Sequence, residues 1–453
     1  MLIRDDVLKL TMPIVAEQVF VMSLGVVNTI MASRVGKEAV SAIGMVDSLS
    51  NILIALFSAL AIGGTVVVAH YTGQNNVKEA NETARQVLFS GLVFSLIITI
   101  FTWAFQKPII ALLYGSADAA VIQNAIIYLN ITLLTYPLIL ITSIASGVLR
   151  GAGDSKTPMT ITIIMNLINI IFSYILIYGI HIHTPYFQLL LPGFAVKGAA
   201  IGISIARASG ALLSIFVLFH GSRVTKLSIK GFKVSMKRQE AIFGIGIPAS
   251  IESLLFNGGK LITQVFIVGL GTVSIASNYI AGSIVGLINI PGSALGIAAT
   301  TLVGQSMGRG ESREAGSLML YLTKLASAAM LILSIVVFPF ARQLASIYTQ
   351  DAKIILLTAQ LLQLSLISMP LLWPISFVLP AGLKGAGDAK YTMVTSILGM
   401  WAFRITLGYI LGIPLKLGVP GIWMGMYADW LVRGVLYLIR LRKGKWKQNI
   451  VIK

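Results

Sequence analysis

The chain has no cysteine and few charged residues. The absence of cysteine excludes disulfide bonds and thiolate metal sites, although it leaves the cellular compartment open. Only 11% of the 453 residues are charged, whereas a soluble globular domain carries about a quarter of its residues as charges. Hydrophobic residues make up 56% of the chain, and its mean hydropathy is +0.88. This composition excludes an ordinary soluble domain and predicts an all-α, polytopic membrane protein.

Long apolar runs recur along the whole chain, and each is long enough to cross a hydrocarbon core of roughly 30 Å as a helix. The first run continues without an A-x-A-like cleavage site, so we expect a retained helix rather than a signal peptide. We expect twelve transmembrane helices, near Leu8–Ser33, Val40–Ala69, Gln86–Phe105, Val121–Leu149, Met159–Ile180, Phe194–Phe219, Ile242–Val268, Ser274–Val303, Leu318–Phe340, Ile354–Leu383, Met393–Leu411 and Val419–Ile439.

The formal net charge is +18, and the basic residues gather between the expected helices. One set of loops, together with both termini, holds most of the 34 Lys and Arg residues. Cytoplasmic loops of membrane proteins carry this excess of Lys and Arg. We therefore expect a multi-pass protein of the cell membrane with both termini in the cytoplasm, and no nucleic-acid partner.

The longest basic stretch, GSRVTKLSIKGFKVSMKRQE, lies at the middle of the chain, from Gly221 to Glu240. We interpret it as a cytoplasmic connector, within which an amphipathic surface helix could contact anionic lipid headgroups. It divides the chain into an N-terminal six-helix lobe at residues 1–220, the connector at 221–240 and a C-terminal six-helix lobe at 241–453.

An internal repeat relates the two halves. GVLRGAGDSKTPM, which begins at Gly147, recurs 234 residues later as AGLKGAGDAKYTM, and the P-x-x-x-E motif at Pro13 recurs 235 residues later at Pro248. Each half contains an even number of expected spans, so both halves enter the membrane in the same direction and form a parallel repeat. Two such bundles leave a cleft that rocking opens to either side in turn, which a transporter needs and an enzyme has no evident need for.

The two glycine-rich copies of the repeat contain Arg150 and Lys384. Neither copy matches the G-x-x-x-x-G-K-[ST] pattern or lies in a strand–turn–helix unit, so nucleotide binding is rejected. We expect tight turns at helix ends there, with Arg150 and Lys384 as anchors at the cytoplasmic interface.

Several of these segments carry a family likeness. GVLRGAGDSKTPM resembles the loop between helices 4 and 5 of multidrug and toxic compound extrusion (MATE) exporters, members of the multidrug/oligosaccharidyl-lipid/polysaccharide flippase superfamily. AHYTGQNNVKEANETARQ, from Ala69, and VGQSMGRGESREA, from Val303, resemble the segments after helices 2 and 8. Pro13 resembles the proline at which helix 1 bends in some members. The resemblance covers essentially the whole chain, and it implies a V-shaped bundle of two lobes.

The resemblance also implies a secondary active antiporter. Such a protein exports small amphipathic, often cationic, drugs or toxic compounds in exchange for protons or sodium ions by alternating access. Its partners are these substrates and the lipid bilayer, and the coupling ion, H⁺ or Na⁺, takes the place of a cofactor. We expect a monomer.

Other functions were weighed against export. The nearest alternative is a flippase for a lipid-linked saccharide or another lipid; it would line its cavity with several cations, and the lobe-facing helices show no evident cluster of them. A membrane enzyme would need clustered carboxylates such as D-x-x-x-D or His-rich metal motifs, and neither occurs. The four histidines fall at span ends or in loops, so we expect no metal site and no enzyme. A scaffold without transport activity would not need paired buried glutamates.

Ionisable residues inside the expected spans are costly, so each marks a candidate functional site. Glu252 is the leading candidate for cation coupling, because it lies about ten residues, or roughly 15 Å, into its helix. In sodium-coupled NorM-type relatives a glutamate of helix 7 binds the cation, and Glu252 lies one turn earlier on the same helix face. Glu17 occupies the equivalent place in the first half, and Asp47 in the second span is a third candidate.

Two departures from the family pattern leave open which lobe carries coupling. In DinF-type and archaeal relatives an aspartate on helix 1 and an Asn-x-x-x-Asp pair on helix 5 form a proton site. Here these positions are Asn28 and Asn169-x-x-x-Ser173, which can hydrogen-bond but cannot hold a titrating proton at ordinary pH. Pro374 stands at about the place of the helix-10 aspartate of NorM-type relatives.

Arg404 needs a carboxylate partner at membrane depth, because arginine stays protonated. Asp429 is the expected partner and Glu252 the alternative, in which case protonation of Glu252 would break the pair. Lys260 and Arg207 are given no role. We expect the substrate cavity between the halves, where Met and aromatic side chains adapt to varied apolar bodies. The residues expected in it are Phe20, Met22, Asn28, Phe256 and Asn257.

Overall fold

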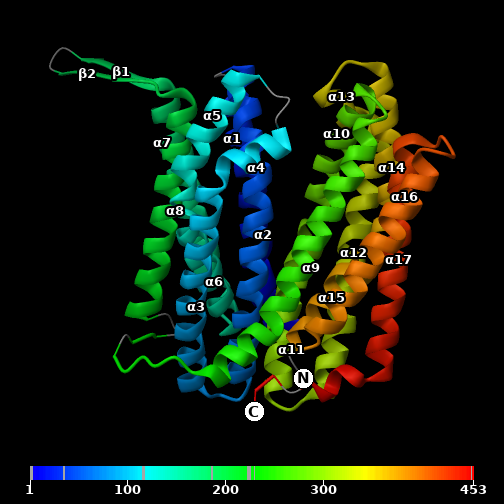
Figure 1. Cartoon of the computed structure of the whole chain (residues 1–453). Coiled ribbons are helices and arrows are strands. Elements are labelled where there is room, and N and C mark those ends of the chain that lie inside the picture. Colours follow the sequence, from blue (N-terminus) through cyan, green and yellow to red (C-terminus); the bar gives the residue numbers. More distant parts are fainter. Residues whose placement is uncertain are drawn as a thin grey trace.

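The computed structural model describes residues 4–33, 36–114, 118–184, 187–221, 226–228, 230–449 and 451–452. Its helices form two lobes that lie side by side (Figure 1). Helices α1 to α8 make up the first lobe and helices α9 to α17 the second. The predicted all-α, two-lobe membrane bundle is thereby confirmed.

The bounds of the elements are as follows. The first lobe contains α1 (Arg4–Ser33), α2 (Lys37–Gly73), α3 (Val77–Ala104), α4 (Gln106–Tyr114), α5 (Ala119–Leu133), α6 (Tyr136–Gly151), α7 (Lys156–Tyr178) and α8 (Ala195–His220), and the antiparallel strands β1 (Gly179–Thr184) and β2 (Phe187–Pro192) join α7 to α8. The second lobe contains α9 (Met236–Val268), α10 (Thr272–Ile288), α11 (Ile290–Gly308), α12 (Ser312–Val337), the short η1 (Phe338–Phe340), α13 (Ala341–Tyr348), α14 (Ala352–Gly385), α15 (Ala389–Leu398), the π-helical η2 (Gly399–Ile405), α16 (Thr406–Gly412), α17 (Gly418–Lys443) and the short η3 (Lys445–Gln448).

Among the described residues, nine helical segments are long and apolar enough to cross a membrane, and two bent helix pairs raise this number to eleven. The pairs are α5–α6, bent by 50°, and α10–α11, bent by 52°. The second helix of each pair has a proline in its first turn, Pro137 in α6 and Pro291 in α11. Because proline has no N–H for the helix ladder, the chain changes direction there. These pairs are the fourth and eighth expected spans.

Helix α17 lies at the twelfth expected span. It is 26 residues long, but Asp429, Arg433 and Arg440 lower its hydropathy. Asp429 and Arg433 are buried, so neighbouring helices rather than lipid surround their charges, as ionisable groups at membrane depth require.

One expected feature differs in detail. Helix α9 begins at Met236, so the last part of the expected connector at 221–240 is helical, while its residues 222–225 and 229 lie outside the described residues. Pro13, which resembles the proline at which helix 1 bends in some family members, lies inside the single helix α1.

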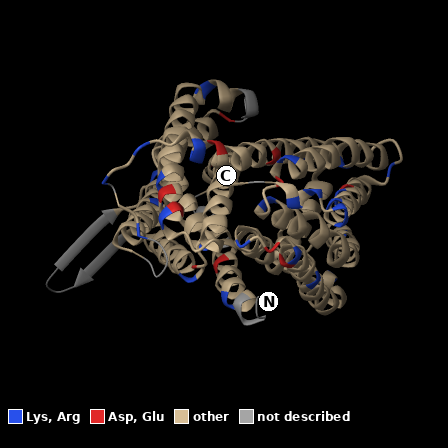
Figure 2. Ribbon diagram, turned by 90° about the horizontal axis from the view of Figure 1, so that it is seen from below, with Lys and Arg blue, Asp and Glu red and all other residues tan. Residues whose placement is uncertain are grey.

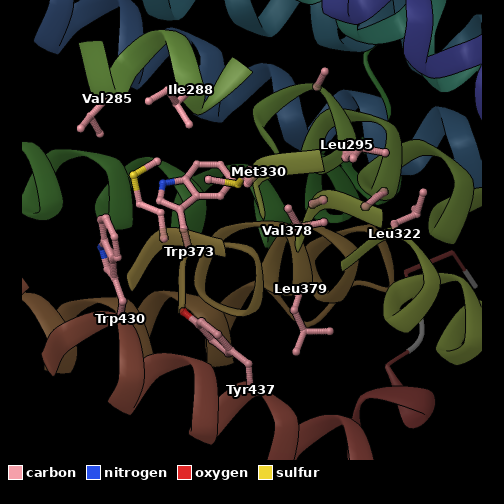
Figure 3. Close-up of a cluster of buried hydrophobic side chains, with 14 of the residues drawn as sticks. Val285, Ile288, Leu295, Leu322, Met330, Trp373, Val378, Leu379, Trp430 and Tyr437 are labelled. Carbon is pink, nitrogen blue, oxygen red and sulfur yellow. The ribbon is translucent and has the colours of Figure 1, made fainter. Parts of the chain in front are cut away.

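Each lobe has its own hydrophobic core. In the second lobe Trp373 of α14 and Tyr437 of α17 are among the buried aromatic residues (Figure 3). The beginning of α1 is an exception to the division into lobes, because Val7, Leu10 and Ile14 pack into the core of the second lobe. The first turns of α1 therefore tie the two lobes together.

The two lobes approach each other most closely at the end that carries both chain termini, where α11 lies beside them (Figure 1; Figure 2 looks onto this end). Helix α2 packs there against α9 and α11. A side chain at Gly63 would collide with the backbone of Ile242, and one at Gly308 with the backbone of His70. Glycine lets helix backbones approach this closely, as small residues do at contacts between membrane helices.

Candidate functional site: a central cavity and two intramembrane charge clusters

A cavity of about 690 Å³ lies between the two lobes. Helices α1, α2, α6, α7 and α8 line it from the first lobe, and α11 and α14 line it from the second. Its charged lining residues are Glu17, Arg150, Arg207 and Lys384, and most of the others are apolar or carry a hydroxyl group. Cavities of this size hold drug-sized molecules.

An ion pair joins three helices of the first lobe at the wall of this cavity. Nη2 of Arg150, in the last turn of α6, donates hydrogen bonds of 2.6 Å to both carboxylate oxygens of Glu17 in α1. The hydroxyl group of Thr162 in α7 donates a third, of 3.1 Å. Charged groups in hydrogen bonds of this kind interact about twice as strongly as neutral ones.

The second lobe has an equivalent pair. Nζ of Lys384, at the end of α14, lies 2.8 Å from Oε2 of Glu252 in α9. The Thr392 hydroxyl group donates a longer hydrogen bond, of 3.5 Å, to the same oxygen. Glu17 and Glu252 are equivalent positions of the sequence repeat, and so are Arg150 and Lys384. Both lobes therefore use the repeat to build one glutamate–cation pair.

These pairs correct two expectations from the sequence. Arg150 and Lys384 do not serve as free interface anchors, because each turns towards the cavity and pairs with a glutamate. The alternative pairing of Glu252 with Arg404 is wrong, because Lys384 is the partner of Glu252. The signal was present in the sequence, since both members of each pair recur at nearly the same offset.

A second cavity, of about 260 Å³, is lined mainly by helices of the first lobe, and Tyr279 of α10 completes its wall. Asn28, Asp47, Tyr128, Asn169 and Ser173 are among its lining residues. The Ser173 hydroxyl group donates a hydrogen bond of 3.3 Å to the Asn169 amide oxygen. Helix α2 thus supplies a carboxylate to the place where α1 and α7 supply amides and a hydroxyl group.

Asp47 differs from the two glutamates in its surroundings. No Lys or Arg of the described residues lies within ion-pair distance of it. Its electrostatic neighbours are Arg207 and the hydroxyl group of Tyr128. Arg207 also lines the central cavity, and its Nη1 donates a hydrogen bond of 3.0 Å to the Thr135 hydroxyl group. The same arginine therefore stands between the two cavities.

The expected pair of Arg404 with Asp429 is wrong. Asp429 pairs with Arg433, through hydrogen bonds of 2.6 Å from Nε and 3.1 Å from Nη2. Both side chains are almost fully buried, at 0% and 2% exposure. They lie four residues apart on α17, so one helical turn brings them to the same face. Gly399 makes room for the pair, because a side chain there would collide with both residues.

Arg404 lies in the π-helical segment η2, beside the ring of Phe256. Its guanidinium carbon is 5.9 Å from the ring centroid, that of Arg433 is 5.2 Å away, and Nζ of Lys260 is 5.1 Å away. Cations are attracted to the face of an aromatic ring at such distances. Phe256 packs edge-on at 6.2 Å against Phe377, which lines the central cavity. We name Lys260, Arg404 and Arg433 the second-lobe cationic cluster.

The residues expected in the substrate cavity lie beside it or elsewhere. On α1 the cavity is lined by Glu17, Gln18 and Val21, which share one face of the helix. Phe20 and Met22 point to either side of that face, because an α-helix has about 3.6 residues per turn. Met22 reaches across to Gly286 of α10.

The other three expected residues are also displaced. Asn28 lines the small cavity of the first lobe instead. Phe256 packs against Phe377 rather than lining the central cavity. The amide nitrogen of Asn257 donates a hydrogen bond of 2.8 Å to the carbonyl oxygen of Ser253, so it is used within its own helix.

The described residues include no group of three or more His, Cys, Asp or Glu side chains that could hold a metal ion. His70, near the end of α2, instead joins the lobes, because its Nε2 lies 2.9 Å from the carbonyl oxygen of Gly385 in α14.

Two lobes of membrane-spanning helices around a shared central cavity define a multi-pass membrane transporter. A model of the MatE family matches residues 13–175 and 248–410 of the chain, one match in each lobe. The chain belongs to this family, and the resemblance to MATE exporters is confirmed.

Individual proteins of the family are similar over their whole length. The chain is 28% identical to "Uncharacterized transporter YisQ" of Bacillus subtilis, covering 97% of this chain and 94% of that one. It is 26% identical to "Probable multidrug resistance protein NorM" of Thermotoga maritima, covering 99% and 94%. A solved structure described as the "outward-facing conformation of a multidrug resistance MATE family transporter of the MOP superfamily" superimposes with a TM-score of 0.86 at 22% identity, covering 97% and 96%. Its twelve helices in two lobes are the same fold.

Proposed function

We propose that the chain is a secondary active antiporter that exports amphipathic organic compounds in exchange for protons or sodium ions. The observation that carries this proposal is the central cavity, because residues of both lobes line it and a movement of the lobes would open it. The similarity to a relative named as a multidrug resistance protein supports the substrate class. The coupling ion takes the place of a cofactor, the bilayer is the surrounding partner, and the working unit is a monomer.

Alternating access follows from where the lobes touch. The contact of α2 with α9 and α11 closes the end that carries the termini, and the His70–Gly385 hydrogen bond belongs to it. The excess of Lys and Arg on one set of loops supports a cytoplasmic position for this end. The described conformation is then open to the outside, and rocking of the lobes about the cavity would break this contact and expose the cavity to the cytoplasm.

For the coupling site we favour Asp47 over the two glutamates. Glu17 and Glu252 each lie against a cation, which suits them to hold helices together at the cavity wall. Asp47 lines the small cavity without an ion-pair partner among the described residues. When Asp47 takes up a proton or a sodium ion, the charge that faces Arg207 is neutralised, so the electrostatic field at the central cavity changes. This gives a physical link between ion and substrate.

A lipid flippase is the second candidate, and one observation favours it. The cavity wall carries three cationic side chains, Arg150, Arg207 and Lys384. The positions of the expected spans did not predict that these three would line one cavity. The same wall gives no support to the cationic substrate that the family resemblance implies.

Transport by the purified protein in proteoliposomes tests this proposal. Efflux of a cationic and an anionic fluorescent amphiphile is measured under separately imposed pH and sodium gradients. Wild type is compared with Asp47→Asn, Glu252→Gln and Glu17→Gln. We expect one gradient to drive efflux in wild type and Asp47→Asn to abolish this response. Loss in Glu252→Gln alone would move the coupling site to the second lobe, and efflux that ignores both gradients in wild type would refute the antiporter.

A further inference from the structure

Building on the proposed transport function, we propose that the central cavity recognises the anionic group of an amphipathic substrate. Arg207 of the first lobe binds this carboxylate, sulfonate or phosphate group, and Lys384 of the second lobe adds positive charge to the cavity wall. The apolar body of the substrate lies against Trp373 and Phe377. This substrate class is the opposite in charge of the cationic compounds that the family resemblance implies.

The charges on the cavity wall are unequal. Three cationic side chains line it, Arg150, Arg207 and Lys384, against one carboxylate, that of Glu17. Glu17 is already bound by Arg150 through both of its oxygens. Glu252 pairs with Lys384 but does not line the cavity. A molecule in the cavity therefore meets all three cations directly, whereas the carboxylate of Glu252 lies behind Lys384.

Arg207 and Lys384 retain donors for a ligand. A guanidinium group has five N–H donors and an ammonium group has three. The hydrogen bond from Arg207 ends on the neutral hydroxyl group of Thr135. No carboxylate of the described residues lies within ion-pair distance of Arg207, although Asp47 is an electrostatic neighbour. Nζ of Lys384 lies 2.8 Å from Oε2 of Glu252. Arginine and lysine in these states are suited to an oxyanion, and Arg207 can bind it through two nitrogens.

The rest of the wall suits an apolar body. Trp373 and Phe377 stack on each other at 4.7 Å between ring centroids, and both line the cavity. Aliphatic side chains complete the surface, among them Val21 of α1 and Met165 of α7. Such a wall recognises aromatic or alkyl groups through burial, while Arg207 fixes the orientation of the head group.

The second-lobe cationic cluster extends the positive charge beyond the cavity. Phe256 connects the two, since it packs against Phe377 on one side and has three cations around its ring. Asp429 forms an ion pair with Arg433. Lys260 and Arg404 have no carboxylate within ion-pair distance among the described residues. This surplus attracts an anion towards the cavity and repels an organic cation.

Two sources could supply the anionic group. An apolar molecule dissolved in water can carry a sulfonate or carboxylate, and a phospholipid carries a phosphate. The chemistry at Arg207 and Lys384 is the same for both. The experiment therefore includes one probe for each source.

Binding is measured first, because it does not depend on an ion gradient. Sulforhodamine B, a net anion, and rhodamine 6G, a cation, share a xanthene ring and are titrated against the detergent-purified full chain by fluorescence anisotropy. We compare wild type with Arg207→Gln and with the double variant Lys384→Gln/Glu252→Gln, which removes the cation without leaving its carboxylate unpaired. Lys78→Gln is the matched control, since Lys78 is an exposed lysine in the first turn of α3 and lies outside the cavity.

We expect wild type to bind sulforhodamine B more tightly than rhodamine 6G. Arg207→Gln should weaken the binding of sulforhodamine B at least about tenfold, the effect of a lost charged hydrogen bond. The double variant should weaken it less, and neither change should weaken the binding of rhodamine 6G. Lys78→Gln should behave as wild type. Tighter binding of rhodamine 6G in wild type, or variants that affect both dyes equally while eluting as folded monomers, would overturn the proposal.

Transport separates this inference from the proposed function. Gradient-driven efflux of rhodamine 6G without binding of sulforhodamine B would leave the exporter standing and refute the anionic substrate. Binding of sulforhodamine B that depends on Arg207, with no gradient-driven movement of either dye, would support the anion site and refute the exporter. Translocation of fluorescent phosphatidylglycerol between leaflets, lost in Arg207→Gln, would support the anion site and identify a lipid as the source of the head group.

Discussion

Both lobes contain the same kind of glutamate–cation pair, but their other charged groups at membrane depth differ. In each lobe a glutamate of the first membrane span pairs with a cation at the end of the fourth span. Glu17 of α1 pairs with Arg150 of α6, and Glu252 of α9 pairs with Lys384 of α14. Away from these pairs, the first lobe encloses a small cavity with the carboxylate of Asp47. The second lobe instead gathers the second-lobe cationic cluster around Phe256.

This difference suggests a division of work between repeated halves. The shared pair joins the helices that form the cavity wall, a task that both halves must perform in the same way. An acidic cavity in one half suits a small cation, and a positively charged surface in the other suits an organic anion. The two copies of a repeat can therefore keep the same fold and the same ion pair, while one copy provides a negatively charged site and the other a positively charged one.

The largest effect is expected from Asp47→Asn in the first lobe. An amide of the same shape cannot carry the negative charge or release a proton. We expect gradient-driven efflux of the transported dye from proteoliposomes to fall to the level of protein-free vesicles. Asp118→Asn, an exposed aspartate before α5, is the control and should transport normally. Full activity in Asp47→Asn would break the comparison, because the first lobe would then lack a coupling role.

In the second lobe, Asp429→Asn should cause the largest loss of stability. It leaves Arg433 buried without a carboxylate, and breaking a buried pair costs about 3–5 kcal/mol. Thermal unfolding in detergent, followed by size-exclusion chromatography, should show a clear fall in Tm.

The matched control is Glu311→Gln, which removes the carboxylate of the more exposed Arg309–Glu311 pair. Surface pairs contribute about 0–1 kcal/mol to the free energy of unfolding. Equal Tm shifts in both variants would mean that the 0% exposure of Asp429 has no energetic consequence.

A smaller effect comes from the shared glutamates. Arg150 makes two hydrogen bonds of 2.6 Å to Glu17, whereas Lys384 makes one contact of 2.8 Å with Glu252. Hydrogen bonds to charged groups contribute about 1.5–3 kcal/mol each, so Glu17→Gln should lower Tm more than Glu252→Gln does. The double variant Glu17→Gln/Arg150→Gln should recover part of the loss. The reverse order of the two single variants would contradict this reading of the pairs.

The smallest effect sharpens the same comparison. The Thr162 hydroxyl group donates to Glu17 at 3.1 Å, and that of Thr392 donates to Glu252 at 3.5 Å, at the limit of a hydrogen bond. Thr162→Val should cost about 1 kcal/mol of unfolding free energy, and Thr392→Val should cost less. Thermal unfolding of the two variants side by side measures the difference, and a larger loss for Thr392→Val would count against it.

The architecture could be predicted from the sequence because its signals are local. A run of apolar residues is a property of one segment, and the repeat of Pro13 and Glu17 at Pro248 and Glu252 is visible without any contact. The bends at α5–α6 and α10–α11 were missed, because the bent spans are as apolar as straight ones. The cost of charge in a membrane also pointed to Glu17, Asp47 and Glu252, although it did not supply their partners.

The ion-pair partner of a charged residue was predicted wrongly where the fold brings a different charged side chain closer to it. Arg433 lies one turn from Asp429 and takes the carboxylate that was expected to bind Arg404. Lys384 reaches Glu252 from 132 residues further along the chain. The substrate residues expected on α1 were wrong for another reason. The face of the helix that lines the cavity carries Gln18 and Val21, and Phe20 and Met22 lie on either side of it.

The sequence by itself determined that this protein crosses the membrane with two repeated helical halves, because hydrophobic length and repeat spacing are written along the chain. Only the tertiary structure decided which charges meet. Ion pairs such as Glu17–Arg150, and the balance of three cations to one carboxylate in the central cavity, arise where helices far apart in sequence are packed together. The charge of a cavity is therefore a property of the folded bundle rather than of any one segment.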